Sequence, residues 1–233
     1  MRIDRRVFAL ALLFALRAPE IRAQMVLPPD EKKTHGAQVP DVTLIGEDST
    51  SFKLSTLAGK PVVVNPVFTT CEQTCPMITS NLNAALAEIG EPGVGYQVLT
   101  ISFDPADGPA ALREYRRKLA LPAAWKLAVA APDERKALLG AIDFNYAALE
   151  QGGFVHANVV AILTPTLNVS SYAHGVTYES ADLRAKLERA TRESSLVRHY
   201  RRYIGLAAAL GILSIVVVLF ATRKRPAAPA TAA

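Results

Sequence analysis

The pattern of apolar and polar positions along residues 38–195 changes between two periods. A continuous apolar run at 61–68 predicts a strand buried in the centre of a sheet, and residues 96–103 are predicted to be a second core strand. Between them, residues 76–89 repeat apolar side chains at helical spacing, which predicts a helix with one face against that sheet. Further helices are predicted at 109–119, 132–142 and 180–192, and further strands at 42–45, 51–54, 125–130, 155–163 and 169–172.

The order of these elements is a small hairpin, alternating strands and helices, and a closing hairpin followed by a helix. This alternation predicts an α/β protein with a thioredoxin-like sandwich fold. Residues 38–195 are numerous enough for one domain with its own core. The polar segment 24–37, which contains Pro28-Pro29, is predicted to be a flexible leader.

A different pattern follows the domain. Residues 204–220 carry no charge and have arginine or lysine on both sides. A hydrocarbon core of about 30 Å needs about 20 helical residues, with about 17 as the lower limit. Tyrosines at 200 and 203 suit a membrane interface. We therefore predict a C-terminal transmembrane helix at 203–221 and a cytoplasmic tail at 222–233.

The N-terminus has the pattern of an export signal. Three arginines precede an apolar stretch at 7–16, and the small residue Ala23 suits cleavage. These features predict a signal peptide at 1–23, with an uncleaved signal anchor as the alternative. Asp4 favours the ordinary secretory route over the twin-arginine route. Together with the predicted transmembrane helix, export predicts a single-pass cell-membrane protein whose domain lies on the periplasmic or extracytoplasmic side.

Charge could suggest a nucleic-acid partner, because the net charge is +5 and the pI is about 9.3. The excess lies at the two ends, since residues 1–37 carry +3 and residues 196–233 carry +6. Residues 38–195 carry −4 and have no basic stripe that could follow phosphates. We therefore predict no nucleic-acid partner.

Cys71 and Cys75, the only cysteines in the chain, follow the apolar run at 61–68 and precede Pro76. Export allows a structural disulfide between them. A bridge across three residues closes a very short loop and adds little stability, so metal binding or reversible disulfide chemistry is favoured. Pro76 suits the first residue of a helix, which predicts both cysteines on the turn before it. There the helix dipole should lower the thiol pKa.

The residue types at this turn leave two kinds of chemistry open. Two thiolates suit a soft ion such as Cu(I), and an added imidazole would accommodate Cu(II), whereas structural zinc would need two histidines as well. His156 is the best candidate third ligand, because the strand after Gly152-Gly153 enters beside the cysteine turn in a thioredoxin-like fold. The other histidines, His35, His174 and His199, are predicted to be surface or interfacial residues.

These segments resemble the Sco/SenC family of copper-binding thioredoxin-like proteins, which help to assemble the binuclear copper centre of cytochrome c oxidase. Phe68 with Cys71-Glu72-Gln73-Thr74-Cys75-Pro76 is similar to the family's Cys-x-x-x-Cys-Pro turn. Ser102-Phe103-Asp104-Pro105 resembles its next strand end, and Phe154-Val155-His156 resembles its histidine segment. The resemblance covers most of 38–192 and implies that Cys71, Cys75 and His156 bind copper.

The resemblance implies a membrane-anchored copper chaperone rather than an enzyme, carrying copper as Cu(I) or Cu(II). Its partner would be the copper-site subunit of cytochrome c oxidase or another copper-receiving protein. The alternative is a thiol–disulfide oxidoreductase that reduces the cysteines of the oxidase copper site, with Cys71 and Cys75 as its catalytic residues. A third class, an interaction domain with an inert disulfide, needs neither thiol.

Three features depart from the family pattern. Val155 and Ala157 stand where the family often has an acidic residue and a serine, and such neighbours orient a ligating imidazole. The predicted anchor is C-terminal, whereas many members carry an N-terminal one. Glu72 and Gln73 differ from the commoner loop residues.

Overall fold

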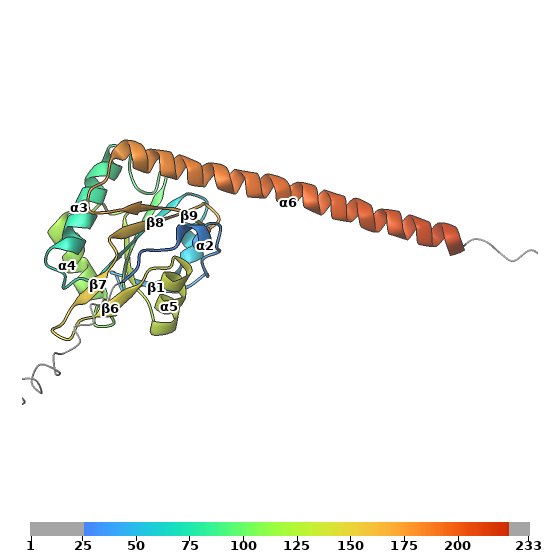
Figure 1. The fold of residues 1–233 in the computed structure, drawn as a ribbon. Helices are drawn as coiled ribbons and strands as arrows, with labels where there is room; N and C mark the ends of the chain where they lie inside the picture. Colours follow the sequence, from blue (N-terminus) through green and yellow to red (C-terminus); the bar gives the residue numbers. More distant parts are fainter. Residues whose placement is uncertain (1–25, 224–233) are drawn as a thin grey trace, which may run out of the picture.

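Seven strands form one mixed sheet in the order β2-β1-β5-β4-β3-β8-β9 (Figure 1). The computed structural model describes residues 26–223, with no description of the side chains at 195–210 and 220–223. The predicted signal peptide at 1–23 and most of the predicted tail at 222–233 lie outside the described residues.

The central strands β3, β4 and β5 are parallel, and the outer strands β1, β8 and β9 pair antiparallel to their neighbours. The strands of this sheet are β1 Thr43–Gly46, β2 Ser51–Lys53, β3 Val62–Val67, β4 Gln97–Ser102, β5 Lys126–Val129, β8 Val159–Leu163 and β9 Val169–His174. Every residue of β3 is buried, as its continuous apolar run predicts for a central strand. A separate two-stranded sheet pairs β6 Tyr146–Ala148 with β7 Phe154–His156.

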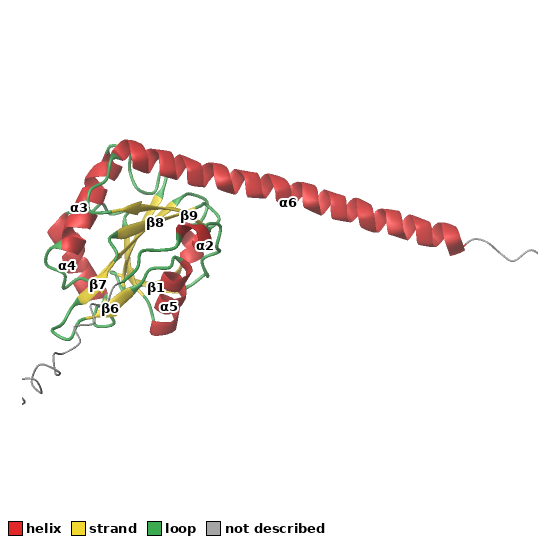
Figure 2. Ribbon diagram, viewed as in Figure 1, coloured by secondary structure: helices red, strands yellow, loops and turns green. Residues whose placement is uncertain are grey.

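Helices cover both faces of the sheet. They are α2 Glu31–Thr34, the 3-10 helix η1 Leu54–Leu57, α3 Thr74–Ala87, α4 Pro109–Leu119, α5 Pro132–Ala141 and α6 Ser180–Arg223. The strands lie between α3 and α4 on one side and α2 and α5 on the other (Figure 2). This layered arrangement fits the predicted α/β sandwich.

A buried polar network fixes α3 against the sheet. The indole N–H of Trp125 donates to the Thr100 hydroxyl at 2.9 Å. The Asn65 amide donates to the hydroxyls of Thr79 at 3.0 Å and Thr100 at 3.3 Å. Thr79 also shares a hydrogen bond of 2.8 Å with Tyr115 in α4. Because these groups are buried, their hydrogen bonds hold β3, β4, α3 and α4 in one register.

Tyr172 of β9 ties α2 and the end of α5 to the sheet. Its hydroxyl lies 3.0 Å from both the Thr34 hydroxyl and the Ile142 carbonyl, which share its one proton. Tyr172 is buried, so Tyr172→Phe leaves both acceptors without this donor. We expect the free energy of unfolding to fall by about 1–2 kcal/mol in urea denaturation. The control is Tyr178→Phe, which removes the hydrogen bond from the Tyr178 hydroxyl to the Gly175 carbonyl. This bond is exposed, so we expect a smaller fall in the free energy of unfolding. An equal effect of the two substitutions would contradict the prediction.

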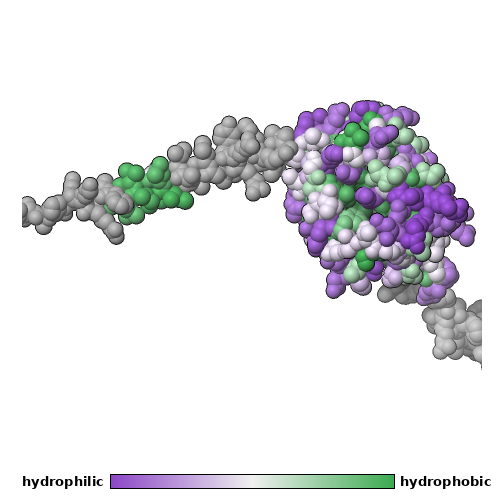
Figure 3. Space-filling view, turned by 180° about the vertical axis from the view of Figure 1, so that it is seen from behind, coloured by the Kyte–Doolittle hydropathy of each residue, from purple (hydrophilic) through white to green (hydrophobic). Residues whose placement is uncertain are grey.

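The predicted transmembrane helix at 203–221 is wrong. Helix α6 is continuous from Ser180 to Arg223, packs by its first turns against β8, β9 and α3, and then extends away from the domain (Figure 1). Side chains 211–219 are exposed and form a hydrophobic band on it (Figure 3). Over the part of the chain that the structure describes, no helix is long and apolar enough to cross a membrane.

Candidate metal centre

The two cysteines lie where β3 passes into α3. The chain leaves β3 at Val67 and turns back, with the Cys71 N–H donating to the Phe68 carbonyl at 3.2 Å. Cys71 is half-buried, whereas Cys75 is only 1% exposed. Both thiols are free, so the pair is available for metal or redox chemistry.

Helix α3 begins earlier than predicted. It starts at Thr74, so Cys75 lies in the first helical turn and only Cys71 lies on the turn before the helix. Pro76 is tolerated as the third helical residue, because the first N–H groups of a helix have no partner within it. The N–H of Cys75 donates instead to the Cys71 sulfur at 3.3 Å. The two cysteines are therefore joined at the helix N-terminus.

The prediction of a lowered thiol pKa is wrong for Cys75. Burial raises the pKa of the Cys75 thiol, and the charges of Cys71 and Asp107 raise it further. Removing a thiolate from water costs more free energy than its interaction with the helix N-terminus contributes. Without a bound cation, Cys75 is therefore a neutral thiol at neutral pH.

His156 reaches the cysteine pair from the small sheet. The predicted strand 155–163 is divided into β7, which ends at His156, and β8, which begins at Val159. The break lets β7 pair with β6 while β8 pairs with β3. The Nε2 atom of His156 lies 3.7 Å from the Cys75 sulfur.

A backbone carbonyl orients the imidazole. Nδ1 of His156 lies 3.0 Å from the carbonyl oxygen of Ala157. When Nδ1 carries the proton and donates it there, Nε2 presents its lone pair toward Cys75. The missing serine side chain at Ala157 therefore does not leave the ring without a hydrogen-bond partner.

Aromatic rings surround His156. The centroid of its ring lies 6.1 Å from that of Phe68, 5.3 Å from Phe103 and 5.7 Å from Phe144. The ring of Phe103 also lies 4.7 Å from that of Tyr146, with the two planes tilted by 36°. Burial lowers the pKa of His156, which favours the neutral imidazole that binds metals.

The spacing of Cys75 and His156 suits one ion between them. With metal–sulfur and metal–nitrogen bonds of about 2.3 and about 2.05 Å, as found for zinc, the distance of 3.7 Å corresponds to an angle of about 115° at the metal. Within residues 26–223, no three Cys, His, Asp or Glu side chains converge closely enough to hold an ion as they stand. Cys71 would have to turn its sulfur toward the Cys75–His156 pair, to which one hydrogen bond already joins it.

The other histidines have different surroundings. Nε2 of His174 lies 2.7 Å from a carboxylate oxygen of Glu31 on the surface, and Nδ1 of His35 lies 2.9 Å from the Ser170 carbonyl. The side chain of His199 lies outside the described residues. None of the three is brought to the cysteine loop by a hydrogen bond that the structure describes.

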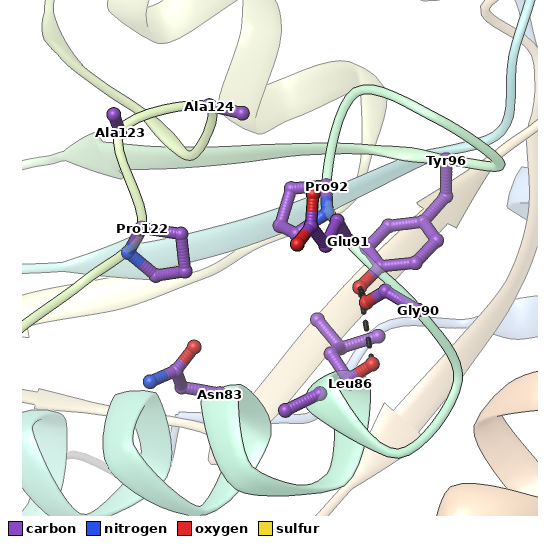
Figure 4. Close-up of a pocket in the computed structure, with 10 residues that line it drawn as sticks. Asn83, Leu86, Gly90, Glu91, Pro92, Tyr96, Pro122, Ala123 and Ala124 are labelled. Atoms are coloured by element: carbon purple, nitrogen blue, oxygen red, sulfur yellow. Dashed lines mark hydrogen bonds between the residues drawn. The ribbon is translucent and has the colours of Figure 1, made fainter.

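One described cavity does not belong to this centre. It has a volume of about 560 Å³ and lies between the C-terminal end of α3 and two loops (Figure 4). Asn83, Leu86, Tyr96 and Pro122 are among its lining residues, and the Tyr96 hydroxyl donates to the carbonyls of Leu86 and Gly90. Cys75 lies at the opposite end of α3. The cavity therefore adds no group to the metal chemistry.

Sequence reasoning missed the residue that holds the cysteine loop. The carboxylate of Asp104, which belongs to the segment with the family resemblance, does not hold this loop and accepts the N–H of Ala106 in its own turn at 2.8 Å. Asp107 instead accepts the Thr69 N–H at 2.8 Å and the Ser102 hydroxyl at 2.5 Å. The spacing between Asp107 and the cysteines in the sequence does not indicate this contact, because it forms only when β3 and β4 pair.

The two thiols should differ in reactivity. At neutral pH we expect iodoacetamide to alkylate Cys71 at least about tenfold faster than Cys75, because Cys75 is buried and its pKa is raised. Mass spectrometry of the Cys71→Ser and Cys75→Ser variants, each with one thiol, gives the two rates. Alkylation of both variants in urea should remove the difference. Equal rates in the folded variants would show that the loop does not protect Cys75.

Comparisons with known proteins agree with this arrangement. The sequence matches the family described as SCO1/SenC over residues 30–191. A protein from Aquifex aeolicus VF5, for which electron transfer is proposed, has a structure with 32% identity and a TM-score of 0.65, covering 67% of this chain and 94% of its own. No curated protein sequence matches the chain.

Two further structures share the fold at lower identity. ScoI from Arabidopsis thaliana, with copper bound, is 23% identical with a TM-score of 0.58 and covers 67% of this chain and 99% of its own. BsSco, described as having a disulfide switch and as a member of the Sco family of cytochrome c oxidase assembly proteins, is 19% identical with a TM-score of 0.57. It covers 72% of this chain and 98% of its own.

These likenesses confirm the thioredoxin-like α/β fold. The family match spans well over half of the chain and includes both cysteines and His156. The chain therefore belongs to the SCO1/SenC family.

Proposed function

We propose that this protein is a copper chaperone that helps to assemble the binuclear copper centre of cytochrome c oxidase. The observation that carries the proposal is the 3.7 Å approach of His156 Nε2 to the Cys75 sulfur, beside the second free thiol of Cys71. Family membership supports the same function, because Sco structures with copper bound share this fold.

The chain's own groups suit the two oxidation states of copper. Cys71 and Cys75 supply two soft sulfur donors, which favour Cu(I), and His156 adds a nitrogen donor suited to Cu(II). Both thiols must lose their protons to water or buffer when the ion binds. The exposed side of Cys71 gives an incoming or departing ion a first point of contact, while Cys75 and His156 hold it away from water.

Copper loading of the purified full chain tests the proposal. We expect about one copper per chain, transfer of that copper to the metal-free copper-site subunit of cytochrome c oxidase, and a changed Cu(II) spectrum in His156→Ala. The double variant Cys71→Ser/Cys75→Ser should bind no copper at the same free concentration. Equal binding by the double variant would overturn the proposal.

Thiol–disulfide exchange is a second candidate function. The 3.3 Å contact between the Cys75 N–H and the Cys71 sulfur brings the two cysteines together, with Cys71 reachable from solvent. In this arrangement the Cys71 sulfur would attack the disulfide of the client, and the Cys75 sulfur would then break the mixed disulfide that forms. The raised pKa of Cys75 slows the second step. In copper-free buffer, reduction of an oxidised copper-site subunit by wild type and His156→Ala alike would favour this function. No exchange by wild type would exclude it.

We also infer that the domain works on the extracytoplasmic side of the cell membrane. The export pattern at residues 1–23 supports this location. The inference does not depend on a membrane-crossing helix. A reporter enzyme that is active only outside the cytoplasm, fused after residue 195, should be active. It should lose activity when residues 2–23 are deleted. Full activity without them would contradict the inference.

A further inference from the structure

Asp107 joins the cysteine loop to the end of β4. Its carboxylate accepts three hydrogen bonds, two from the backbone N–H and hydroxyl of Thr69 and one from the hydroxyl of Ser102. Thr69 lies two residues before Cys71, and Ser102 is the last residue of β4. One side chain therefore holds two segments that are far apart in sequence.

These bonds limit where the Cys71 sulfur can lie. The Phe103 N–H donates to the Val67 carbonyl at 2.9 Å, which fixes the chain just before the loop. Asp107 then fixes Thr69, and the Cys71 N–H closes the turn onto Phe68. Charge-assisted hydrogen bonds such as these are stronger than neutral ones. The loop therefore holds Cys71 near Cys75 before any ligand binds.

The carboxylate also places a negative charge near the sulfurs. Asp107 accepts from the backbone N–H of Thr69, two residues before Cys71, so its carboxylate lies beside the loop that carries the Cys71 sulfur. A fixed negative charge beside a metal ion stabilises the more highly charged ion, so Cu(II) gains more than Cu(I).

We propose that Asp107 is a positioning residue of the copper centre, which holds the Cys71 loop in place and, through its charge, favours bound Cu(II) over Cu(I). This rests on the proposed copper function. Partners that hold a metal ligand in place change metal affinity by about 10–100-fold when removed.

Two substitutions separate the charge from the hydrogen bonds. Asp107→Asn removes the charge but keeps an oxygen that can accept from Thr69 and Ser102, whereas Asp107→Ala removes both. The matched control is Asp104→Asn, since Asp104 bonds within its own turn and not to the cysteine loop.

For bound copper, we expect Asp107→Asn to raise the ratio of Cu(I) to Cu(II) affinity about tenfold, which is about 59 mV in the potential of a one-electron couple. Asp107→Ala should in addition weaken copper binding about 10–100-fold. Asp104→Asn should change neither quantity. An unchanged potential in Asp107→Asn would overturn the role of the charge.

Hydrogen exchange of the copper-free chain tests the hydrogen bonds on their own. In Asp107→Ala the Thr69 amide should exchange at least about tenfold faster, while the Val64 amide in β3, which reports opening of the sheet, changes little. Equal acceleration at both amides, or none at Thr69, would overturn the positioning role. If the unaltered chain binds no copper, the proposed function and the role of the charge both fail, and the exchange at Thr69 alone decides whether Asp107 holds the loop.

Discussion

Cys75→Ser is expected to lower the affinity of the chain for Cu(I) by roughly a thousandfold, since a hydroxyl is a poor ligand for a soft ion. Cys75 is the donor that lies 3.7 Å from His156, and its N–H also binds the Cys71 sulfur. Replacing its sulfur therefore removes the donor atom that lies next to His156, whereas the backbone contact to Cys71 is kept. Competition with a coloured Cu(I) chelator measures the affinity.

The matched control for this substitution is Thr70→Ser, an exposed position in the same loop. It should leave the affinity within about twofold, because no ligand changes. Cys75→Ser must also keep its fold for the result to count, which circular dichroism and urea denaturation check. An affinity of folded Cys75→Ser within about tenfold of wild type would show that copper does not bind at this pair.

The sequence predicted the parts of the fold that depend on local patterns. A continuous apolar run located β3, because a strand buried on both faces needs an apolar side chain at almost every position. Helical spacing located α3 and α4, and Pro109 stands at the predicted start of α4. The rarity of cysteine and histidine in the chain then drew attention to Cys71, Cys75 and His156.

Features that depend on contacts between distant segments could not be predicted. The break between β7 and β8 arises because β7 pairs with β6, whose three residues carry too little pattern to identify. Burial of Cys75, which reverses the expected direction of its pKa shift, depends on the whole layer of side chains above it. The contact of Asp107 with Thr69 exists only because β3 and β4 are neighbours.

The membrane prediction failed for a different reason. The uncharged run at 204–220 was treated as an isolated segment, whereas the structure joins it to the domain through one helix, α6. Within residues 26–223, no helix is long and apolar enough to cross a membrane.

Phe103→Ala is expected to lower the free energy of unfolding by about 3–5 kcal/mol in urea denaturation, as large-to-small substitutions of buried aromatic residues do. Phe103 is fully buried, and its ring contacts those of Phe68, Phe154 and Tyr146 as well as His156. The matched control is Val94→Ala, which trims a side chain that is 71% exposed and should cost less than about 0.5 kcal/mol. A loss below about 1 kcal/mol in Phe103→Ala would show that the aromatic cluster is not part of the core.

Phe103→Leu separates stability from the orientation of the imidazole. It keeps most of the buried volume, so we expect a loss of only about 1–2 kcal/mol. It removes the ring that packs against His156 at 5.3 Å, so the imidazole gains freedom and the Cu(II) spectrum of the loaded chain should shift toward that of His156→Ala. A folded Phe103→Leu variant with a wild-type Cu(II) spectrum would mean that the bond of Nδ1 to the Ala157 carbonyl orients the ring by itself. Phe103 follows β4 and packs against Tyr146 of β6 and His156 of β7. The packing that stabilises the domain therefore also positions the His156 ring next to the Cys75 sulfur.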